Sequence, residues 1–441
     1  MATKKRAAAA LNGAIKLCVK DSLPFDAPSD EADKWLRRLA RGVKARELVV
    51  ALGDAGMAED EEIVYCERDG SWRAGRYIGT IVFEGHTLVI EPRFGRDRIL
   101  EWLSEEQSIM LTRMPGMLEQ HENFIAALLA VVWGRAFVEA ARHGLPALRR
   151  EASTTGTVLR GALSVRDSIR LRAAGRPQVV SVRRERSLEH VVSEVIVAAY
   201  TVLRRELKAV SPQWLPPRAA ELLPHLLAAA GAHPAVPSRA ELAKIRYTPI
   251  TAGFARFAEL SRQIATRRGL AASAADSGET HGLLLDVAEL WELHVLHVLR
   301  AVSRPLVVRH GTRDQGSHGK LLTSEIDGTH MGTLIPDALL CDRDEVRAVL
   351  DAKYKRIHGK PQREDLYQMA AYLAHFAGRD GRSLGALIYP QDPDRPEEAA
   401  IERSNPWRVE AGKRVWFVAL PLERGAAEAR CARLLASLDQ A

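Results

Sequence analysis

The stretch from Ile335 to Ile357 reads "IPDALLCDRDEVRAVLDAKYKRI" and contains two apolar runs joined by a short polar connection. Each run carries an aspartate, Asp337 in the first and Asp351 in the second. Runs of this kind predict two neighbouring strands, and the short connection predicts that they pair antiparallel. A carboxylate beside buried strand residues is costly to desolvate, so it needs a salt bridge, a hydrogen-bond network or a metal ion as its partner.

Lys353 follows Asp351 by two positions in "AVLDAKYK". Alternate residues of a strand leave the same face, so these two side chains can share one site. Antiparallel pairing brings Asp337 to the same place, and two close carboxylates repel each other unless a cation binds between them. Mg²⁺ prefers carboxylate oxygens and water, and a lysine beside it can stabilise charge on a phosphoryl oxygen. The pattern therefore predicts phosphodiester hydrolysis, with a plain ion pair between Asp351 and Lys353 as the competing interpretation.

Two predicted helices add polar side chains that could face this site. In "REDLYQMAAYLAHFA" the residues Asp365, Gln368 and Tyr372 lie three and four positions apart and share one stripe. The stretch 283–302, "LLLDVAELWELHVLHVLRAV", is predicted as a single helix with Glu292 on a stripe of acids. Taken alone, each acid of that stripe is more often a solvated surface residue than a metal ligand.

The length of 441 residues predicts two or three domains. We expect an α/β multidomain protein with three parts: a β-rich module at 1–98, a mainly helical middle region with a basic segment at 99–270, and an α/β domain with a mixed sheet at 281–441. Alternating residues at 62–94 predict the strands of the module. Helical periodicity predicts helices at 99–147, 188–207 and 240–268. Small and polar residues at 269–282 predict a linker.

Composition narrows the class of protein. With 46% hydrophobic and 27% charged residues, the chain has the usage of soluble globular proteins. Four cysteines lie far apart without a CxxC pair, which predicts a reducing compartment and no structural zinc. The longest apolar run, "FIAALLAVVW" from Phe124, is too short to span a bilayer. We therefore expect a cytoplasmic protein without a membrane segment.

The formal net charge of +7 comes largely from arginine, which is crowded between Arg149 and Arg186 where acids are few. Guanidinium groups form bidentate contacts with phosphate, so the segment predicts an anionic partner such as DNA. The candidate contacts to the DNA backbone are Arg160, Arg183, Arg184 and Arg186. A solvated basic face, or contacts of these arginines with nearby acids or a partner subunit, would explain the same pattern.

These motifs together resemble a known nuclease superfamily. "PD" at Pro336 and Asp337, followed by "DAK" from Asp351 to Lys353, is similar to the PD-(D/E)xK pattern, and "YQMAAY" supplies the Q-x-x-x-Y helix of several branches. More narrowly, "IPDALL", "VLDAKYK", "REDLYQMAAYLA" and "LIYP" resemble the McrC family, the nuclease subunits of McrBC-type modification-dependent restriction systems. "LLLDVAELWELHVL" and "RYIGTIVFEGHTLVIEPRFG" also resemble that family, with Arg93 where a lysine is expected.

The resemblance implies a metal site in a restriction-endonuclease-like domain. Asp337 and Asp351 would bind Mg²⁺, or Mn²⁺ in its place, and the Ala352 carbonyl would be a further ligand. Lys353 would position the attacking water.

Three further residues receive roles by the same resemblance. Gln368 and Tyr372 would support the site or the substrate, and Glu292 would act on the metal through water. The specific part of the match is the C-terminal domain, whereas the middle region is matched by the order of its elements.

The family also implies a partner, a McrB-like AAA+ GTPase hexamer that recognises modified double-stranded DNA and translocates it. The Gly-Lys pairs of this chain, at Gly319, Gly359 and Gly412, are not followed by Ser or Thr as a P-loop requires. Nucleotide hydrolysis is therefore expected from another chain.

We expect a Mg²⁺-dependent DNA endonuclease subunit that also stimulates its GTPase partner through the N-terminal module. A stand-alone restriction or repair nuclease with the same site is one alternative. A non-catalytic activator or DNA-binding subunit is the other, and the intact set of Asp337, Asp351 and Lys353 argues against it.

Overall fold

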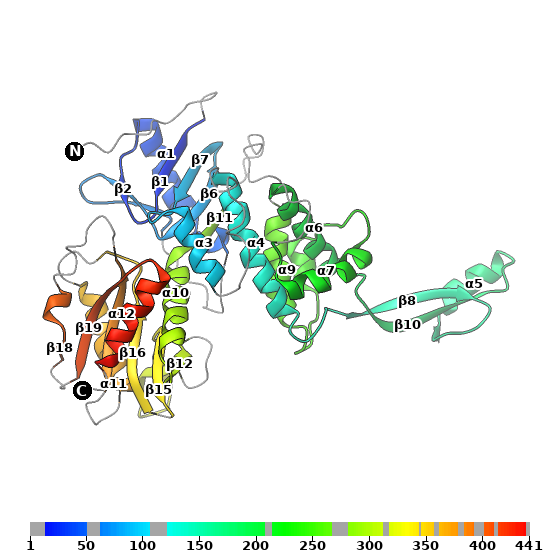
Figure 1. Ribbon diagram of the computed structural model, residues 1–441. Coiled ribbons are helices and arrows are strands. Elements are labelled where there is room, and N and C mark those ends of the chain that lie inside the picture. Colours follow the sequence, from blue (N-terminus) through cyan, green and yellow to red (C-terminus); the bar gives the residue numbers. More distant parts are fainter. Residues whose placement is uncertain are drawn as a thin grey trace. The chain divides into compact units, whose positions relative to one another are not determined.

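The computed structural model describes residues 14–50, 62–105, 121–207, 214–266, 281–311, 317–343, 345–356, 361–377, 383–391, 401–409 and 413–437 (Figure 1). The chain divides into two compact units, one formed by 1–108 with 273–441 and the other by 109–272. The first unit thus takes residues from both ends of the chain. The domain boundaries expected at 98, 270 and 281 stay a prediction, and most of the expected linker lies outside the described residues.

The N-terminal residues of the first unit form two sheets. The larger has the strand order β1-β7-β6-β11-β3 and the smaller the order β2-β5-β4. Their strands are β1 (Lys16–Lys20), β2 (Pro24–Phe25), β3 (Val49–Val50), β4 (Val64–Cys66), β5 (Trp72–Ala74), β6 (Tyr77–Phe83), β7 (His86–Glu91) and β11 (His281–Asp286), and the helices are α1 (Asp30–Gly42), α2 (Ala45–Leu48) and α3 (Arg96–Glu105). Between β6 and β7, Glu84 and Gly85 both have positive φ, which suits the two-residue turn of a twisted hairpin.

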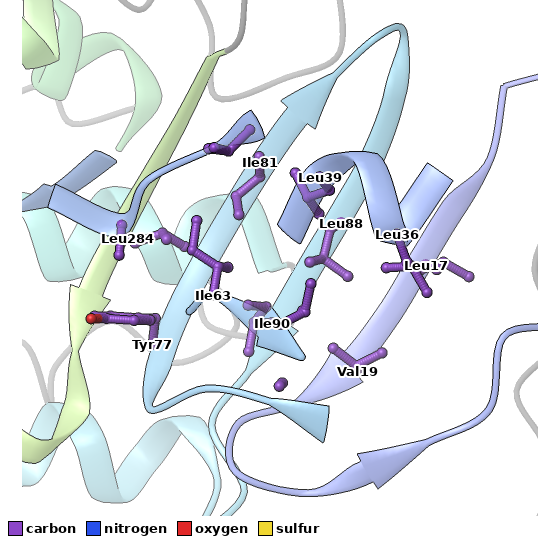
Figure 2. Close-up of a cluster of buried hydrophobic side chains, with 14 of the residues drawn as sticks. Leu17, Val19, Leu36, Leu39, Ile63, Tyr77, Ile81, Leu88, Ile90 and Leu284 are labelled. Atoms are coloured by element: carbon purple, nitrogen blue, oxygen red, sulfur yellow. The ribbon is translucent and has the colours of Figure 1, made fainter. Parts of the chain in front are cut away.

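Strand β11 comes from far along the chain and completes the N-terminal sheet. It pairs antiparallel with β6 and parallel with β3. Figure 2 shows Leu284 of β11 with Leu39, Ile81 and Leu88 in one cluster of buried side chains. Burial of apolar surface at this position joins the N-terminal module to the C-terminal half of the chain.

The single helix predicted at 283–302 is wrong in its first four residues. Helix α10 (Val287–Val302) begins after Asp286, whose carboxylate accepts the Ala288 N–H at 2.9 Å and caps the helix. Asp286 also pairs with Arg76 at 2.9 Å, so it is a buried structural acid rather than a solvated one. The three leucines before it fit a strand or a helix equally, and the distant strand β6 decides between them.

The C-terminal residues form a six-stranded mixed sheet with the order β12-β15-β16-β17-β19-β18. Its strands are β12 (Val307–His310), β15 (Ala338–Asp342), β16 (Glu345–Ala352), β17 (Leu384–Pro390), β18 (Trp407–Arg408) and β19 (Arg414–Leu420); a hairpin of β13 (Gly319–Thr323) and β14 (His330–Leu334), the helices α11 (Arg363–Phe376) and α12 (Arg424–Ala436), and the short η3 (Glu402–Ser404) complete it. Strands β15 and β16 pair antiparallel, as predicted, whereas β16, β17 and β19 run parallel.

Both faces of this sheet are buried. Helix α11 packs on β16 and β17 and shares one core with them, in which Met369 meets Val349 and Leu387. Leu350 and Ile388 alternate with those residues and are buried too, since α10 packs against β16 and α12. Alternation therefore turns Val349 and Asp351 toward the face that α11 covers.

The second unit has a helical core. Its helices are α4 (His121–Ala140), α6 (Val191–Glu206), α7 (Pro217–Ala230), α8 (Arg239–Ala243) and α9 (Gly253–Thr266). The Trp133 indole N–H donates to Ser261 Oγ at 3.0 Å, and the Phe137 and Phe257 rings stack at 5.2 Å. The helix predicted at 240–268 is broken between α8 and α9, where Pro249 lacks the N–H that a helix needs. Part of the helix predicted at 99–147 lies outside the described residues.

The basic segment of this unit folds into a sheet that the sequence did not predict. Strands β8 (Leu148–Gly156) and β10 (Val179–Ser187) pair antiparallel along nine residues each, and β9 (Ala162–Leu163) adds to β10. The helix α5 (Val165–Ala173) follows β9. We call residues 148–187 the arginine ribbon. Exposed large apolar side chains lie among its arginines, namely Val158, Leu159, Leu163, Val165 and Ile169.

In the part of the chain that the structure describes, no helix combines the length and the apolar character that crossing a membrane requires.

Candidate active site

Asp337 and Asp351 lie at one edge of the six-stranded sheet. Asp337 directly precedes β15, and Asp351 is the penultimate residue of β16. The register places Ala338 opposite Leu350, so the two aspartates are neighbours across the strand pair. Asp351 is only 2% exposed. Asp337 Oδ2 accepts the Ala352 N–H at 2.6 Å, which holds that carboxylate against the end of β16.

Lys353 completes this group, which we call the Asp-Lys site. Its Nζ lies 2.6 Å from Asp351 Oδ2 and donates to Gln368 Oε1 at 2.8 Å. Its backbone N–H donates to the Ile388 carbonyl at 2.8 Å, so the main chain of the lysine is fixed to β17. The ion pair that was the competing interpretation is present, and it is one contact within a larger network.

Helix α11 supplies the support for the lysine. The Gln368 side-chain amide donates to the Tyr372 hydroxyl at 2.8 Å, and that hydroxyl donates to the Ile335 carbonyl at 2.8 Å. The chain of hydrogen bonds thus runs from Lys353 to the residue two positions before Asp337. Because each group is fixed by the next, the lysine ammonium has a defined position.

Glu292 approaches the site from α10. Its Oε1 lies 3.0 Å from Nε2 of His310, a buried histidine at the end of β12. The backbone is tightly packed here, because a side chain at Gly311 would place its Cβ 1.8 Å from the Pro336 carbonyl oxygen. The glycine therefore allows β12 to lie close to the Pro336–Asp337 step.

The carboxylates influence one another electrostatically. Burial raises the pKa of Asp337 well above its usual range, and the negative charges of Glu292 and Asp351 add to this rise. Burial also raises the pKa of Asp351, although the Lys353 ammonium opposes that rise. For Lys353 burial lowers the pKa, but the charge and hydrogen bond of Asp351, together with the charges of Asp337 and Asp365, outweigh burial, so the net pKa is raised. Buried acids that disfavour one another's ionisation create a demand for a cation.

A second polar cluster lies beside the first. Lys355 Nζ pairs with Asp365 at 2.7 Å, and the Tyr389 hydroxyl lies 3.5 Å from the same carboxylate. Asp365 was predicted on one stripe with Gln368 and Tyr372, and the structure gives it Lys355 as partner instead of Lys353. It therefore supports the segment after β16 and does not contact the Asp-Lys site directly.

Sequence reasoning missed His310, Lys355 and Tyr389. Lys355 had a signal, because it follows Lys353 by two positions and so lies on the same side of the chain. His310 had none, since its strand is separated from Glu292 and from β15 by long stretches of sequence. His294, which lies close to Glu292 on α10, is buried with its ring stacked on Trp102 at 5.2 Å.

A metal ion would find hard oxygen donors at this edge of the sheet. Across the described residues, no three side chains of His, Cys, Asp or Glu converge as a ready metal cluster. Two carboxylates and a main-chain carbonyl suit Mg²⁺, which keeps several waters and needs few protein ligands. The raised pKa values of the two aspartates fit the same ion, because a divalent cation would offset the negative charges that Glu292 and Asp351 place beside Asp337.

The candidate DNA-binding arginines lie on the arginine ribbon of the second unit. Arg183 pairs with Glu185 at 2.8 Å, and Arg184 lies 3.4 Å from Glu151 on the facing strand. Arg160 and Arg186 are exposed. Pairing with nearby acids, one of the competing interpretations, is thus present for two of the four arginines.

Comparison with solved structures gives the fold. A chain in the "Refined half-complex from tetradecameric assembly of Thermococcus gammatolerans McrB AAA+ hexamers with bound McrC" is similar at 15% identity with a TM-score of 0.54, over 96% of this chain and 100% of that one. A chain in the cryo-EM structure of the Thermococcus gammatolerans McrBC complex has 16% identity and a TM-score of 0.35, over 65% and 87%. No curated protein matches the sequence.

Comparison with protein families gives the assignment. The profile of the family described as "McrBC 5-methylcytosine restriction system component" matches residues 72–390, more than half of the chain. The match includes β5 to β7, the second unit and the Asp-Lys site with α11. It confirms the resemblance seen in the motifs, and the chain belongs to the family of McrBC 5-methylcytosine restriction system components.

Proposed function

We propose that this McrBC component is the DNA endonuclease subunit of a modification-dependent restriction system and that residues 281–441 are its PD-(D/E)xK domain. The observation that carries the proposal is the meeting of Asp337, Asp351 and Lys353 at one sheet edge, with Asp351 and Lys353 in direct contact. Acids that repel one another at a buried edge are unfavourable for a merely structural role. Such sites are typical of metal-dependent chemistry.

Mg²⁺ is the proposed cofactor, and Mn²⁺ would substitute for it. Asp337, Asp351 and the Ala352 carbonyl would hold the ion. When bound, it would polarise the scissile phosphate and offset the charge that develops during hydrolysis. The Ala352 N–H already fixes Asp337 from the opposite strand, so this carboxylate needs little rearrangement.

The protein's own groups would handle water and charge. Lys353 would present its ammonium group to the attacking water or to a phosphoryl oxygen, while Gln368 keeps that group in place. Tyr372 anchors Gln368 to the main chain at Ile335 and would act on Lys353 indirectly, through Gln368. Glu292, held by His310, would act on the metal through water.

The proposed partner is a McrB-like AAA+ GTPase hexamer, and the proposed substrate is modified double-stranded DNA. The structure of the similar chain comes from an assembly of McrB AAA+ hexamers with bound McrC, which supports a partner of that kind. We assign docking on the GTPase and its stimulation to the N-terminal β module. The module has its own buried core, so its surface can serve a partner without involving the Asp-Lys site.

The arginine ribbon remains a proposed contact to the DNA backbone. Its exposed arginines suit phosphate, because such contacts need charge and reach but no buried pocket. The exposed apolar side chains near Arg160 suit a protein surface better, so a partner subunit is the competing occupant. A salt series separates these two cases.

The deciding experiment purifies the chain with a McrB-like AAA+ GTPase and assays cleavage of methylated and unmethylated DNA. We expect cleavage of methylated DNA that requires both proteins, GTP and Mg²⁺, and that EDTA stops. Cleavage by this chain alone would favour the stand-alone nuclease. A complex that hydrolyses GTP and binds DNA, yet leaves methylated DNA intact in Mg²⁺ and in Mn²⁺, would favour the non-catalytic activator.

A further inference from the structure

A buried arginine joins the N-terminal module to the segment that follows Lys353. Arg93 lies just after β7, and its side chain is 2% exposed. Its guanidinium carbon is 4.2 Å from the ring centre of Tyr354 and 4.6 Å from that of Phe94. Its backbone N–H donates to Asp21 Oδ1 at 2.5 Å, and Asp21 is itself fully buried.

The contacts of Arg93 explain why an arginine rather than a lysine suits this place. A planar guanidinium can lie against two rings at once and stays charged when buried, whereas an ammonium is a compact, strongly hydrated charge. Asp21 supplies the opposite charge, with its Oδ2 3.9 Å from Arg93 Nε. Burial raises the pKa of the Asp21 carboxyl and the arginine opposes that rise, so each charge compensates the other.

Tyr354 and its two neighbours face opposite sides. Lys353 and Lys355 send their ammonium groups to α11, where they contact Gln368 and Asp365. Tyr354, between them, sends its ring to Arg93 and Phe94 instead. The three-residue segment is therefore clamped from both sides, by α11 on one and by the N-terminal module on the other.

A second path of aromatic contacts runs from the same module to Glu292. Phe94 meets Trp102 of α3 at 6.4 Å between ring centres, and Trp102 meets Trp291 at 5.3 Å. Trp291 directly precedes Glu292, and the indole N–H of Trp102 donates to the Leu422 carbonyl at 3.2 Å. The module thus contacts the immediate neighbours of two residues of the proposed site.

We propose that Arg93 is a positioning residue that holds Tyr354 and thereby fixes the main chain of Lys353 for cleavage. What Lys353 does in the reaction rests on the proposed function. The position of the Lys353 main chain does not depend on the proposed function. The role of Arg93 and the proposed function can therefore be disproved separately. The clamp also gives the N-terminal module a physical connection to the Asp-Lys site, through which partner docking would reach the chemistry.

The test is amide hydrogen exchange of the full-length protein with its GTPase partner. The Lys353 N–H bonded to Ile388 is the direct probe. We expect Arg93→Lys to speed exchange of the peptide 351–356 by about tenfold while β17 and β19 stay protected. Arg424→Lys is the matched control, because this arginine lies on helix α12, where its side chain is 42% exposed and pairs with Glu428 of the same helix.

Tyr354 provides variants that keep both charged residues, Arg93 and Asp21, and change only the side chain beside them. Tyr354→Leu removes the ring and should repeat the faster exchange, whereas Tyr354→Phe keeps the ring and loses only the hydroxyl beside Asp21, so its exchange should rise less than that of Tyr354→Leu. In single-turnover assays at saturating Mg²⁺, Arg93→Lys and Tyr354→Leu should lower the cleavage rate about tenfold without changing DNA affinity. Unchanged exchange at 351–356 would overturn the proposal, as would faster exchange spread evenly over the whole sheet. If the wild type cleaves no DNA, the proposed function fails and the exchange result still decides the role of Arg93.

Discussion

The Asp-Lys site and the arginine ribbon are both rich in charge, yet they hold it in opposite ways. In the site, the Asp351 and Lys353 side chains are 3% and 18% exposed and lie within one hydrogen-bonded network. On the ribbon, the Arg183 and Arg184 side chains are 53% and 77% exposed and pair with acids in water. Exposed pairs contribute little free energy, whereas breaking a buried network is costly. The first arrangement therefore fixes side chains, and the second leaves them able to exchange partners.

The strongest test of this contrast is Asp351→Ala. We expect cleavage to fall by about three orders of magnitude or more, since a metal ligand and the partner of Lys353 are both lost. The protein should stay folded with little change in melting temperature, because relief of the repulsion between two buried acids offsets the loss of the Asp351–Lys353 contact. Cleavage and thermal unfolding are measured on the same preparation.

Asp342→Ala is the control for that variant. Asp342 lies on β15, the strand that Asp337 precedes, and it is exposed at the strand's other end. It should cut DNA like the wild type. An Asp351→Ala protein that also cuts normally in Mg²⁺ would remove the metal site from consideration.

The part of the site that local geometry determines could be predicted from sequence. The strand period placed Asp351 and Lys353 together, the short connection brought in Asp337, and helical spacing aligned Gln368 with Tyr372. His310 could not be found in this way. Its contact with Glu292 depends on β12 pairing with β15, and no local pattern records which strand becomes the neighbour of another.

The fold shows the same limit. Strands β6 and β7 were predictable because an apolar face and a turn with positive φ belong to the same short stretch. The strands of the arginine ribbon were missed because most of their residues are polar, so apolar and polar residues do not alternate along them. Strand β11 was assigned to a helix because its pairing partner β6 lies about two hundred residues away.

A smaller effect is expected from Tyr372→Phe, which removes one hydroxyl from the network. Gln368 then loses its acceptor and the Ile335 carbonyl its donor, which should cost about 1–3 kcal/mol of unfolding free energy. Cleavage should fall about tenfold, because Lys353 loses the support of a fixed Gln368. Urea denaturation and single-turnover cleavage measure the two effects.

Tyr367→Phe is the matched control on the same helix. Its side chain is 67% exposed, so both quantities should stay at wild-type values. If Tyr372→Phe and Tyr367→Phe behave alike, the hydrogen bonds from Tyr372 and Gln368 do not support Lys353. The buried network would then fix its side chains no better than the exposed pairs do.

The proposed DNA contact of the arginine ribbon is tested with a triple variant. In it alanine replaces Arg183, Arg184 and Arg186. Each lost phosphate contact should lower the slope of log affinity against log salt by about one unit, because fewer counterions are released. The melting temperature should hardly change, since the pairs with Glu185 and Glu151 are exposed. DNA affinity of the assembled complex is measured between about 50 mM and about 200 mM salt.

Arg218→Ala serves as the control for the salt series, because Arg218 is an exposed arginine of the same unit but lies on α7. An unchanged slope in the triple variant with intact assembly would place the DNA path elsewhere. Loss of assembly with the GTPase would instead identify the ribbon as a protein contact, as its exposed apolar residues suggest.

The smallest expected effect concerns an exposed ion pair in the same unit as the Asp-Lys site. It tests whether an ion pair contributes little free energy because it is exposed or because of the unit in which it lies. Asp33 on α1 accepts hydrogen bonds from Arg37 at 2.8 Å and from the Trp72 indole at 2.9 Å, and these bonds lower the pKa of its carboxyl. Because the folded pKa lies below the unfolded one, the stabilisation is complete above the unfolded value. It is lost as the pH falls through the lowered folded value.

Asp33→Asn should remove that share of the acid sensitivity and nothing else. The unfolding free energies of wild type and variant, measured from about pH 6 to about pH 3, should therefore differ most at the upper end and converge at the lower end. Cleavage should not change, because Asp33 lies in the N-terminal module, where its carboxylate accepts hydrogen bonds from Arg37 and Trp72. A constant difference across the whole range would mean that the carboxylate acts through packing. Exposure would then not explain why exposed ion pairs of this unit contribute less free energy than the buried network around Lys353.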